Sequence, residues 1–202
     1  MNGVKLPESF YERTNVVRIA RELLGKSLYT RIDGVVTGGM IVETEAYSWK
    51  ERGCHAYDNR KTARNAVMFG PGGHAYVYLC YGIHYLFNVV TNSTGTADAI
   101  LIRALEPHTG IDTMEARRAK LANRYHLTSG PGKLTRALAI DRTWNGKSLM
   151  DDDVWIADNN VSVPSSRIVA SARIGIDYAG EDALLPWRFY IKGNLWVSGK
   201  KS

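Results

Sequence analysis

The chain has 202 residues, of which 45% are hydrophobic and 23% charged, as is typical of a globular protein with a core of its own. We therefore expect one domain over residues 1–202. Lys and Arg outnumber Asp and Glu by 26 to 20, so the formal net charge is +6 and the pI is about 9.3. This excess favours a polyanionic partner such as DNA or RNA, although many basic proteins bind neither.

Several other protein classes are excluded by what the sequence lacks. Two cysteines, Cys54 and Cys80, are too few for a disulfide framework and have no metal-ligand spacing. The polar residues 1–14 do not form a secretion signal, and no apolar run is long enough to cross a membrane. We expect a reducing compartment, either a bacterial cytoplasm with its nucleoid DNA or a nucleus if the source is eukaryotic.

The first third of the chain predicts a helix, two strands and a loop. Apolar side chains recur at helical spacing in the helix, and Gly25 ends this pattern. The loop is polar and contains five Lys or Arg residues, so we expect it at the surface. These elements are a helix at 15–24, strands at 27–30 and 35–47 around an Asp33–Gly34 turn, and a loop at 50–66.

Residues 74–103 are the stretch around which we expect the fold to be organised. They predict two aromatic strands, 76–80 and 83–88, followed by a third strand that ends at Arg103. Gly82 accepts a positive φ and can reverse the chain between the first two strands. Tyr81 then lies at the hairpin tip, where two interpretations are open. Its ring either folds back to cover the sheet, the commoner use of an aromatic residue, or projects as a wedge that enters a stacked duplex.

The last part of the chain predicts two helices, a turn and two late strands. The second helix has a buried face made of Leu134, Ala137, Leu138 and Ile140. These elements are helices at 110–123 and from 129–132 onward, a turn at Asn145–Gly146, and strands at 170–178 and 188–192. Neighbouring antiparallel strands without strand–helix alternation indicate an α+β fold: a single compact domain with a curved antiparallel sheet, surrounding helices and a protruding β-hairpin.

Two carboxylates stand beside an aromatic ring in the strand at 35–47. The period of two places Glu43, Glu45 and Tyr47 on one face. The first interpretation is a solvent-facing edge strand; the second is a catalytic carboxylate beside the wall of a pocket. Arg103 is a candidate partner that would keep a partly buried glutamate ionised, or it is an ordinary surface arginine.

Other candidate sites are weaker. Residues 129–133, Ser-Gly-Pro-Gly-Lys, lack the spacing of a nucleotide-binding loop, but their amides and Lys133 could contact a DNA phosphate. His55, His74 and His84 do not have the spacing of a zinc site, and we expect no metal.

A set of short motifs follows in a characteristic order between about Gly25 and Ser198. They are Ile-Val-Glu-Thr-Glu-Ala-Tyr at 41–47, Arg64-Asn65, Met68-Phe69, Tyr76-Val77-Tyr78 with Tyr81-Gly82, Asn88, Leu-Ile-Arg-Ala-Leu-Glu-Pro at 101–107, and Ser129-Gly130-Pro131. This order and spacing resemble the alkyladenine DNA glycosylase family, whose members are also called 3-methyladenine or methylpurine DNA glycosylases.

The resemblance implies a monofunctional base-excision enzyme. Such an enzyme flips a damaged purine out of duplex DNA and hydrolyses its N-glycosidic bond, as a monomer, with no cofactor and no strand-cleaving lyase activity. The preferred damaged purine stays open among 3-methyladenine, 7-methylguanine, hypoxanthine and ethenoadenine.

The resemblance also implies residue roles. Glu45 matches the general base, and Arg103 matches the arginine that orients it. The flipped base is enclosed by Tyr47, His55 and Tyr78, although the loop before His55 is one residue shorter than in mammalian members. Asn88 matches the asparagine that discriminates against the amino group of guanine.

DNA contacts are implied at the hairpin tip and at basic side chains. Tyr81, beside Gly82, matches the intercalating tyrosine, which favours the wedge interpretation. Arg60, Arg64 and Lys133 are expected to contact phosphates. Two alternatives remain, namely a non-catalytic protein that binds distorted DNA with the Tyr81 wedge, and a module that binds or modifies RNA.

Overall fold

The computed structural model describes residues 3–118 and 121–199. Nine strands of this part of the chain form one antiparallel sheet in the order β1-β7-β2-β3-β6-β5-β4, with β9 paired to β3 and β8 paired to β9. The strands are β1 (Val4–Lys5), β2 (Ser27–Ile32), β3 (Val35–Tyr47), β4 (Ala75–Cys80), β5 (His84–Thr91), β6 (Asp98–Thr109), β7 (Val154–Asp158), β8 (Ile168–Ser171) and β9 (Arg188–Ile191). The predicted α+β class with an antiparallel sheet is confirmed.

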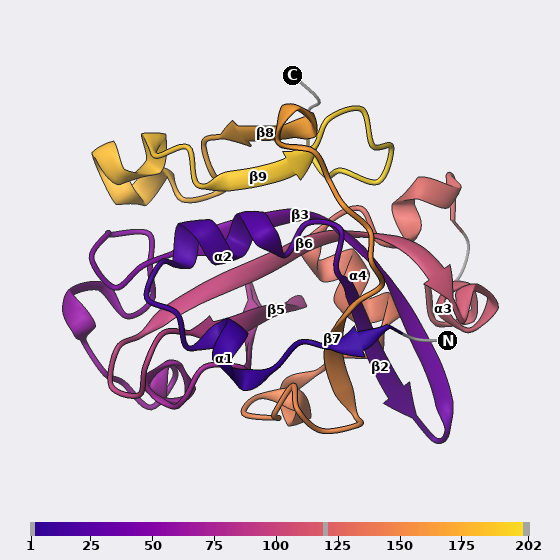
Figure 1. The fold of residues 1–202 in the computed structure, drawn as a ribbon, viewed down its shortest axis with the longest axis horizontal. Helices are drawn as coiled ribbons and strands as arrows, with labels where there is room; N and C mark the ends of the chain where they lie inside the picture. Colours follow the sequence, from indigo (N-terminus) through magenta and orange to yellow (C-terminus); the bar gives the residue numbers. More distant parts are fainter. Residues whose placement is uncertain (1–2, 119–120, 200–202) are drawn as a thin grey trace.

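The long strand β3 lies at the centre of this sheet, beside β6 (Figure 1). Its other edge pairs first with β2 and then, from Glu43 to Glu45, with β9. The change of partner occurs at Ile41, whose N–H donates to the carbonyl of Lys26 and whose carbonyl accepts from the N–H of Gly25. Both glutamates are fully buried. The interpretation of β3 as a solvent-facing edge is therefore wrong.

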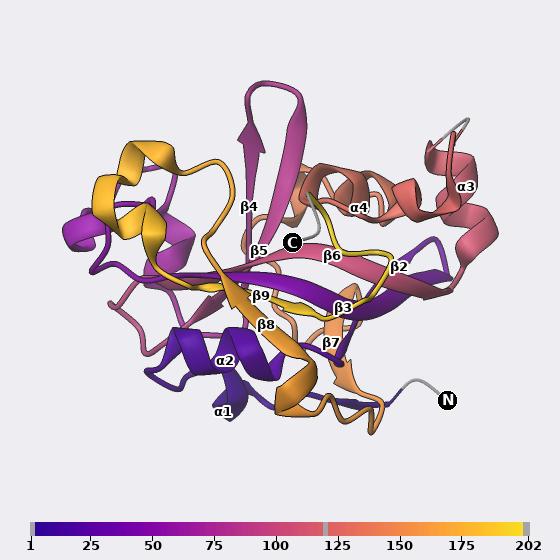
Figure 2. The same ribbon diagram turned by 90° about the horizontal axis from the view of Figure 1, so that it is seen from above.

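Helices cover both faces of the sheet. Helices α1 (Glu8–Tyr11) and α2 (Val16–Glu22) lie on one face, and α3 (Ile111–Arg118) and α4 (Pro131–Ala137) lie on the other (Figure 2). The α2 helix begins after Asn15, whose side chain accepts from the N–H of Arg18, so one free helix N–H is satisfied. The predicted buried face of the second late helix is confirmed for Leu134 and Ala137; Leu138 and Ile140 are also buried but lie beyond the end of α4.

The β4–β5 hairpin projects from the sheet on the same side as α4 (Figure 2). At its tip, Tyr81 and Gly82 have φ values of 50° and 69°, and the N–H of Ile83 donates to the carbonyl of Cys80 at 3.0 Å. Positive φ at both central residues matches the twist of a tight hairpin. The Tyr81 side chain is 87% exposed. The interpretation in which this ring covers the sheet is therefore wrong.

Four predicted elements differ from the structure. The strand predicted to end at Arg103 continues to Thr109 as β6. The strand predicted at 170–178 ends at Ser171, because the chain leaves the sheet before Gly175, which has a φ of 77°. The helix predicted at 110–123 ends in the structure at Arg118, and residues 119–120 lie outside the described residues. The loop at 50–66 is only partly at the surface, because Glu51, Cys54 and Asn65 are buried. The short 3-10 helices are Tyr57–Asn59, Ala66–Phe69, Arg124–Leu127, Arg142–Trp144, Ser165–Arg167 and Asp177–Leu184.

The main hydrophobic core runs from Leu6 to Val197 between the sheet and its helices. A second cluster, which includes Cys54, Met68 and Tyr76, fills the space between the 50–70 segment and the hairpin strands. Cys54, Met68 and Tyr76 of the second cluster also line the cavity described below. Within the described residues, every helix falls short of the length and apolarity needed to span a bilayer.

Candidate active site

A cavity of about 660 Å³ extends along the β4–β5 hairpin from its strands to its tip. Its other walls come from the 53–68 segment, strands β5 and β6, the first residues of α4 and the 174–178 segment. Eight of the eleven predicted site residues line it: Tyr47, His55, Arg64, Tyr78, Tyr81, Asn88, Arg103 and Lys133. Glu45, Arg60 and Gly82 do not. The fold thus brings most of the predicted site residues to one place.

Aromatic side chains form one wall of the cavity. The His55 and Tyr78 ring centres are 4.6 Å apart in an edge-to-face arrangement, and His55 Nδ1 lies 2.8 Å from the hydroxyl of Tyr76. Removal from water, reinforced by the charge of Arg64, lowers the pKa of His55 to about 4 although part of its ring stays open to the cavity. Burial raises the pKa of Tyr76 to about 12 and raises that of Tyr78 as well. This wall is therefore uncharged at neutral pH.

Asn88 lies on β5 and is buried at the cavity surface. Its amide nitrogen donates to the carbonyl of Tyr76 at 3.0 Å and approaches that of Leu86 at 3.5 Å. These bonds use the donors of the side chain and leave its oxygen for a ligand in the cavity.

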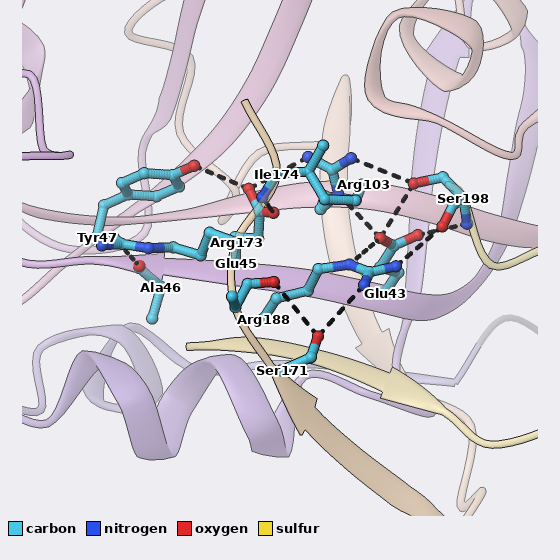
Figure 3. A network of polar contacts seen from close by, with 11 residues as sticks. Glu43, Glu45, Ala46, Tyr47, Arg103, Ser171, Arg173, Ile174, Arg188 and Ser198 are labelled. Atoms are coloured by element: carbon cyan, nitrogen blue, oxygen red, sulfur yellow. Dashed lines mark hydrogen bonds and ion pairs between the residues drawn. The ribbon is translucent and has the colours of Figure 1, made fainter. Parts of the chain in front are cut away.

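The Glu45 carboxylate is fully buried and is held by residues of the cavity lining; Figure 3 shows its contacts. Oε2 accepts from the hydroxyl of Tyr47 at 2.8 Å and lies 3.2 Å from Nη1 of Arg103, and Oε1 accepts from the N–H of Ile174 at 2.8 Å. All three partners line the cavity. Burial and the charge of Glu45 raise the pKa of Tyr47, so this phenol stays protonated and donates to the carboxylate.

Arg103 connects Glu45 to a second buried carboxylate, Glu43 (Figure 3). Burial by itself would lower the pKa of the Arg103 guanidinium, but the charges of Glu45 and Glu43 outweigh burial and raise it. Arg188 from β9 and Ser198 also bind Glu43. The alternative in which Arg103 is an ordinary surface residue is wrong, because it is buried between these carboxylates.

Arg173 is a site residue that the sequence did not reveal. It binds Glu51 through two bonds of 2.7 Å, and its guanidinium lies 4.7 Å from the centre of the Tyr47 ring. It therefore holds the 173–174 segment, including the N–H that binds Glu45, against β3. Arg188 was missed as well. Buried carboxylates need cationic partners, which could have indicated further arginines but not which ones.

The predicted DNA-contacting residues are spread over a wider area. The Arg64 guanidinium lies 5.2 Å from the centre of the Tyr78 ring, and Lys133 lies at the start of α4. Burial and the nearby charge of Arg118 lower the pKa of Lys133. Gly82 is at the hairpin tip, and Arg60 is an exposed loop residue, so neither lines the cavity.

A metal centre would need several ligands close together. In the part of the chain that the structure describes, no group of three or more His, Cys, Asp or Glu side chains could hold a metal ion.

Sequence comparisons point to one family. The model of the family described as Methylpurine-DNA glycosylase (MPG) matches residues 9–195. A protein of Carboxydothermus hydrogenoformans named "Putative 3-methyladenine DNA glycosylase" is 49% identical over 195 residues, which cover 96% of this chain and 99% of that protein. Proteins of the same name from Chlamydia felis and Methanocella arvoryzae are 47% and 45% identical, over 92% and 96% of this chain and 95% of each relative. The chain belongs to the methylpurine-DNA glycosylase family.

Proposed function

We propose that this protein is a DNA glycosylase that removes damaged purines from duplex DNA by hydrolysis, with Glu45 as the general base. The observation that carries the proposal is the setting of the Glu45 carboxylate, which is buried and held by three groups that all line one cavity. The family match supports the reaction class.

The cavity suits a planar purine that has left the DNA stack. Its volume of about 660 Å³ lies within the range usual for small-ligand sites, and Tyr47, His55 and Tyr78 line it. Aromatic rings stack on a base at about 1–3 kcal/mol each. The free oxygen of Asn88 supports a role in reading the edge of the base. A positively charged alkylpurine gains a further cation–π attraction to the tyrosines.

The hydrolysis needs one water molecule and one general base. A carboxylate offers about four acceptor sites; Glu45 accepts hydrogen bonds from Tyr47 and Ile174 and forms an ion pair with Arg103. A remaining acceptor site takes a hydrogen bond from the attacking water. The water oxygen bonds to C1′, its proton moves to Glu45, and the C1′–N bond breaks with its electron pair passing to the purine. A cationic alkylpurine leaves as a neutral base, whereas a neutral lesion such as hypoxanthine leaves as an anion and takes up a proton from solvent. Glu45 then returns its proton to solvent, and the products are an abasic site and a free base.

The excised base has to reach this cavity from inside the duplex. Flipping costs a few kcal/mol, and less for damaged bases, which gives one source of selectivity. The exposed Tyr81 at the tip of the projecting hairpin supports its proposed role as the wedge that fills the vacated stack. Arg60, Arg64 and Lys133 are proposed to contact phosphates.

The direct test is incubation with duplexes that carry hypoxanthine, ethenoadenine or methylated purines, followed by alkaline cleavage at abasic sites. We expect release of the damaged base from at least one of these duplexes. The excision rate of Glu45→Gln should be about 10²–10⁴-fold lower, which is the usual contribution of a general base. Glu45→Gln should still bind the lesion duplex. Unchanged base release by Glu45→Gln would exclude this role.

The two alternatives predict different results in the same assays. A non-catalytic binder of distorted DNA releases no base from any duplex, with or without the substitution. An RNA-directed module binds structured RNA in preference to damaged duplex DNA when the two compete.

We also propose that the chain acts as one domain and as a monomer. A single hydrophobic cluster that runs from Leu6 to Val197 supports the first point. One cooperative unfolding transition and a sedimentation mass of one chain are the expected results.

A further inference from the structure

Glu43 is the buried carboxylate to which the catalytic scheme above gives no role. Its Oε1 accepts from Arg103 Nε at 2.9 Å, Arg188 Nε at 2.7 Å and Ser198 Oγ at 3.0 Å, and its Oε2 accepts from the Ser198 N–H at 2.6 Å. These four bonds all come from the protein, and Glu43 is fully buried and does not line the cavity. Any effect of Glu43 on the reaction must therefore act through its neighbours.

Arg103 is the neighbour that reaches the proposed general base. A guanidinium pairs most favourably with a single carboxylate through two parallel bonds. Arg103 instead divides its donors, with Nε on Glu43 at 2.9 Å and Nη1 on Glu45 at 3.2 Å (Figure 3). Its Nη2 lies 3.3 Å from the hydroxyl of Ser198, which also binds Glu43. Glu45 thus receives one contact from Arg103 rather than two.

We propose that Glu43 is a positioning residue that holds Arg103 in this divided arrangement and thereby keeps one acceptor site of Glu45 open for the attacking water. The proposal rests on the function proposed above. Without Glu43, the nearest carboxylate to Arg103 is Glu45, and a two-point pairing there occupies the site that the water needs. The role of Glu43 is thus to prevent a stronger but unproductive ion pair.

Charge balance decides how this can be tested. Glu43, Glu45, Arg103 and Arg188 carry two negative and two positive charges and are all buried. Glu43→Gln alone leaves an uncompensated buried charge, which is strongly destabilising. The double variant Glu43→Gln/Arg188→Met removes one charge of each sign and restores the balance, while Arg103 and Glu45 are kept.

We expect the double variant to fold and to bind a lesion duplex within about 2-fold of the unaltered protein. Its single-turnover excision rate should fall by about 10- to 100-fold, the scale of loss from a misplaced reacting group. The excision rate is expected to fall on the acid side of its pH profile, which we call the acid limb. In the double variant this fall should occur at lower pH, because a second contact from Arg103 favours the carboxylate form of Glu45. The other groups that face Glu45, namely Tyr47, Arg173 and the Ile174 amide, are unchanged.

Two further variants complete the design. Glu106→Gln is the matched control, because this glutamate lies on β6, accepts from Asn194 at 2.6 Å and is outside the cluster. Its excision rate and the position of its acid limb should match those of the unaltered protein. Glu43→Asp keeps the charge but withdraws the carboxylate from Arg103, so it should reproduce the slower rate and the shifted limb, and it serves as the test if the double variant does not fold.

The outcomes separate this inference from the proposed function. A reduced rate with an unmoved acid limb would mean that Glu43 only supports the fold, and a rate equal to that of the unaltered protein would also overturn the inference. In both cases the loss of excision in Glu45→Gln would leave the proposed function standing. If Glu45→Gln retains its activity, the proposed function fails first.

Discussion

Replacing Tyr47 with Phe removes one hydrogen bond to Glu45 and little else. The hydroxyl of Tyr47 donates to Oε2 of Glu45 at 2.8 Å, while its ring lines the cavity and lies 4.7 Å from the Arg173 guanidinium. The phenyl ring of the variant keeps the cavity wall and the contact with Arg173. The change therefore isolates the effect of one donor on a buried carboxylate.

The expected magnitude follows from the charge of the acceptor. A hydrogen bond to a charged group contributes about 1.5–3 kcal/mol, so Tyr47→Phe should lower the free energy of unfolding by that amount. Less stabilisation of the carboxylate form should move the acid limb of the excision rate upward by about 1–2 pH units, at about 1.36 kcal/mol per unit. This shift is opposite in direction to the one expected for Glu43→Gln/Arg188→Met. Looser orientation of Glu45 should slow excision by about 10- to 100-fold.

Single-turnover excision from pH 4.5 to 8.5 measures the rate and the acid limb, and denaturant unfolding measures stability. Tyr76→Phe is the matched control, because its hydroxyl lies 2.8 Å from His55 in the same cavity and has a neutral partner. Loss of a neutral hydrogen bond costs about 0.5–1.5 kcal/mol and should leave the acid limb in place. If Tyr47→Phe weakens lesion binding but leaves the acid limb unmoved, the hydroxyl acts on the flipped purine and not on Glu45.

Three further predictions concern the hairpin, the aromatic wall and the chemistry. Tyr81→Ser should reduce the fluorescence change of an ethenoadenine duplex on binding, whereas Ile83→Ser at the same exposed turn should not; equal signals from both variants would remove the wedge assignment. His55, with its pKa lowered from 6.5 to about 4, binds its proton more weakly in the folded state, so its contribution to stability is complete above pH 6.5 and is lost as the pH falls toward 4. Urea unfolding of His55→Gln should accordingly show a shallower fall in stability across that window than the unaltered protein. Borohydride should trap no covalent adduct with DNA, and an adduct that disappears in Lys133→Ala would instead indicate lyase chemistry at this cavity-lining lysine.

The centre of the site could be predicted from the sequence because it lies within one strand. Alternation along residues 35–47 places Glu43, Glu45 and Tyr47 on one face, and the structure joins Glu45 to Tyr47 directly. Arg103 was found because it follows a recognisable apolar run, although the strand predicted to end there continues in the structure to Thr109. The alternation of side chains could not show whether β3 lies at an edge or in the middle of the sheet. This depends on the partner strands that β3 acquires on both sides.

The remainder of the site comes from distant parts of the chain that have no regular pattern. Arg173 reaches Glu51 across 122 residues, and Ser198 reaches Glu43 across 155. The segment at 170–178 has apolar residues at strand-like spacing, but it leaves the sheet after Ser171. The reason is that Arg173 binds the carbonyl of Ala46 and the Ile174 amide binds Glu45, both on β3. The direction of Tyr81 was ambiguous for a different reason: the positive φ at the tip allows a tight turn but does not determine where the ring points.

The switch of β3 from β2 to β9 has a consequence for the order in which the protein is assembled. Synthesis proceeds from the N-terminus, so Glu43 and Glu45 leave the ribosome well before Arg173, Arg188 and Ser198. Until those later residues dock, residues Glu43–Glu45 of β3 have no β9 partner, Glu43 lacks three of its four hydrogen bonds, and Glu45 lacks the bond from Ile174. A nascent chain of the first 110 residues therefore contains both glutamates and Arg103 but not the full set of groups that hold them, which is complete only when the C-terminal segment packs against β3.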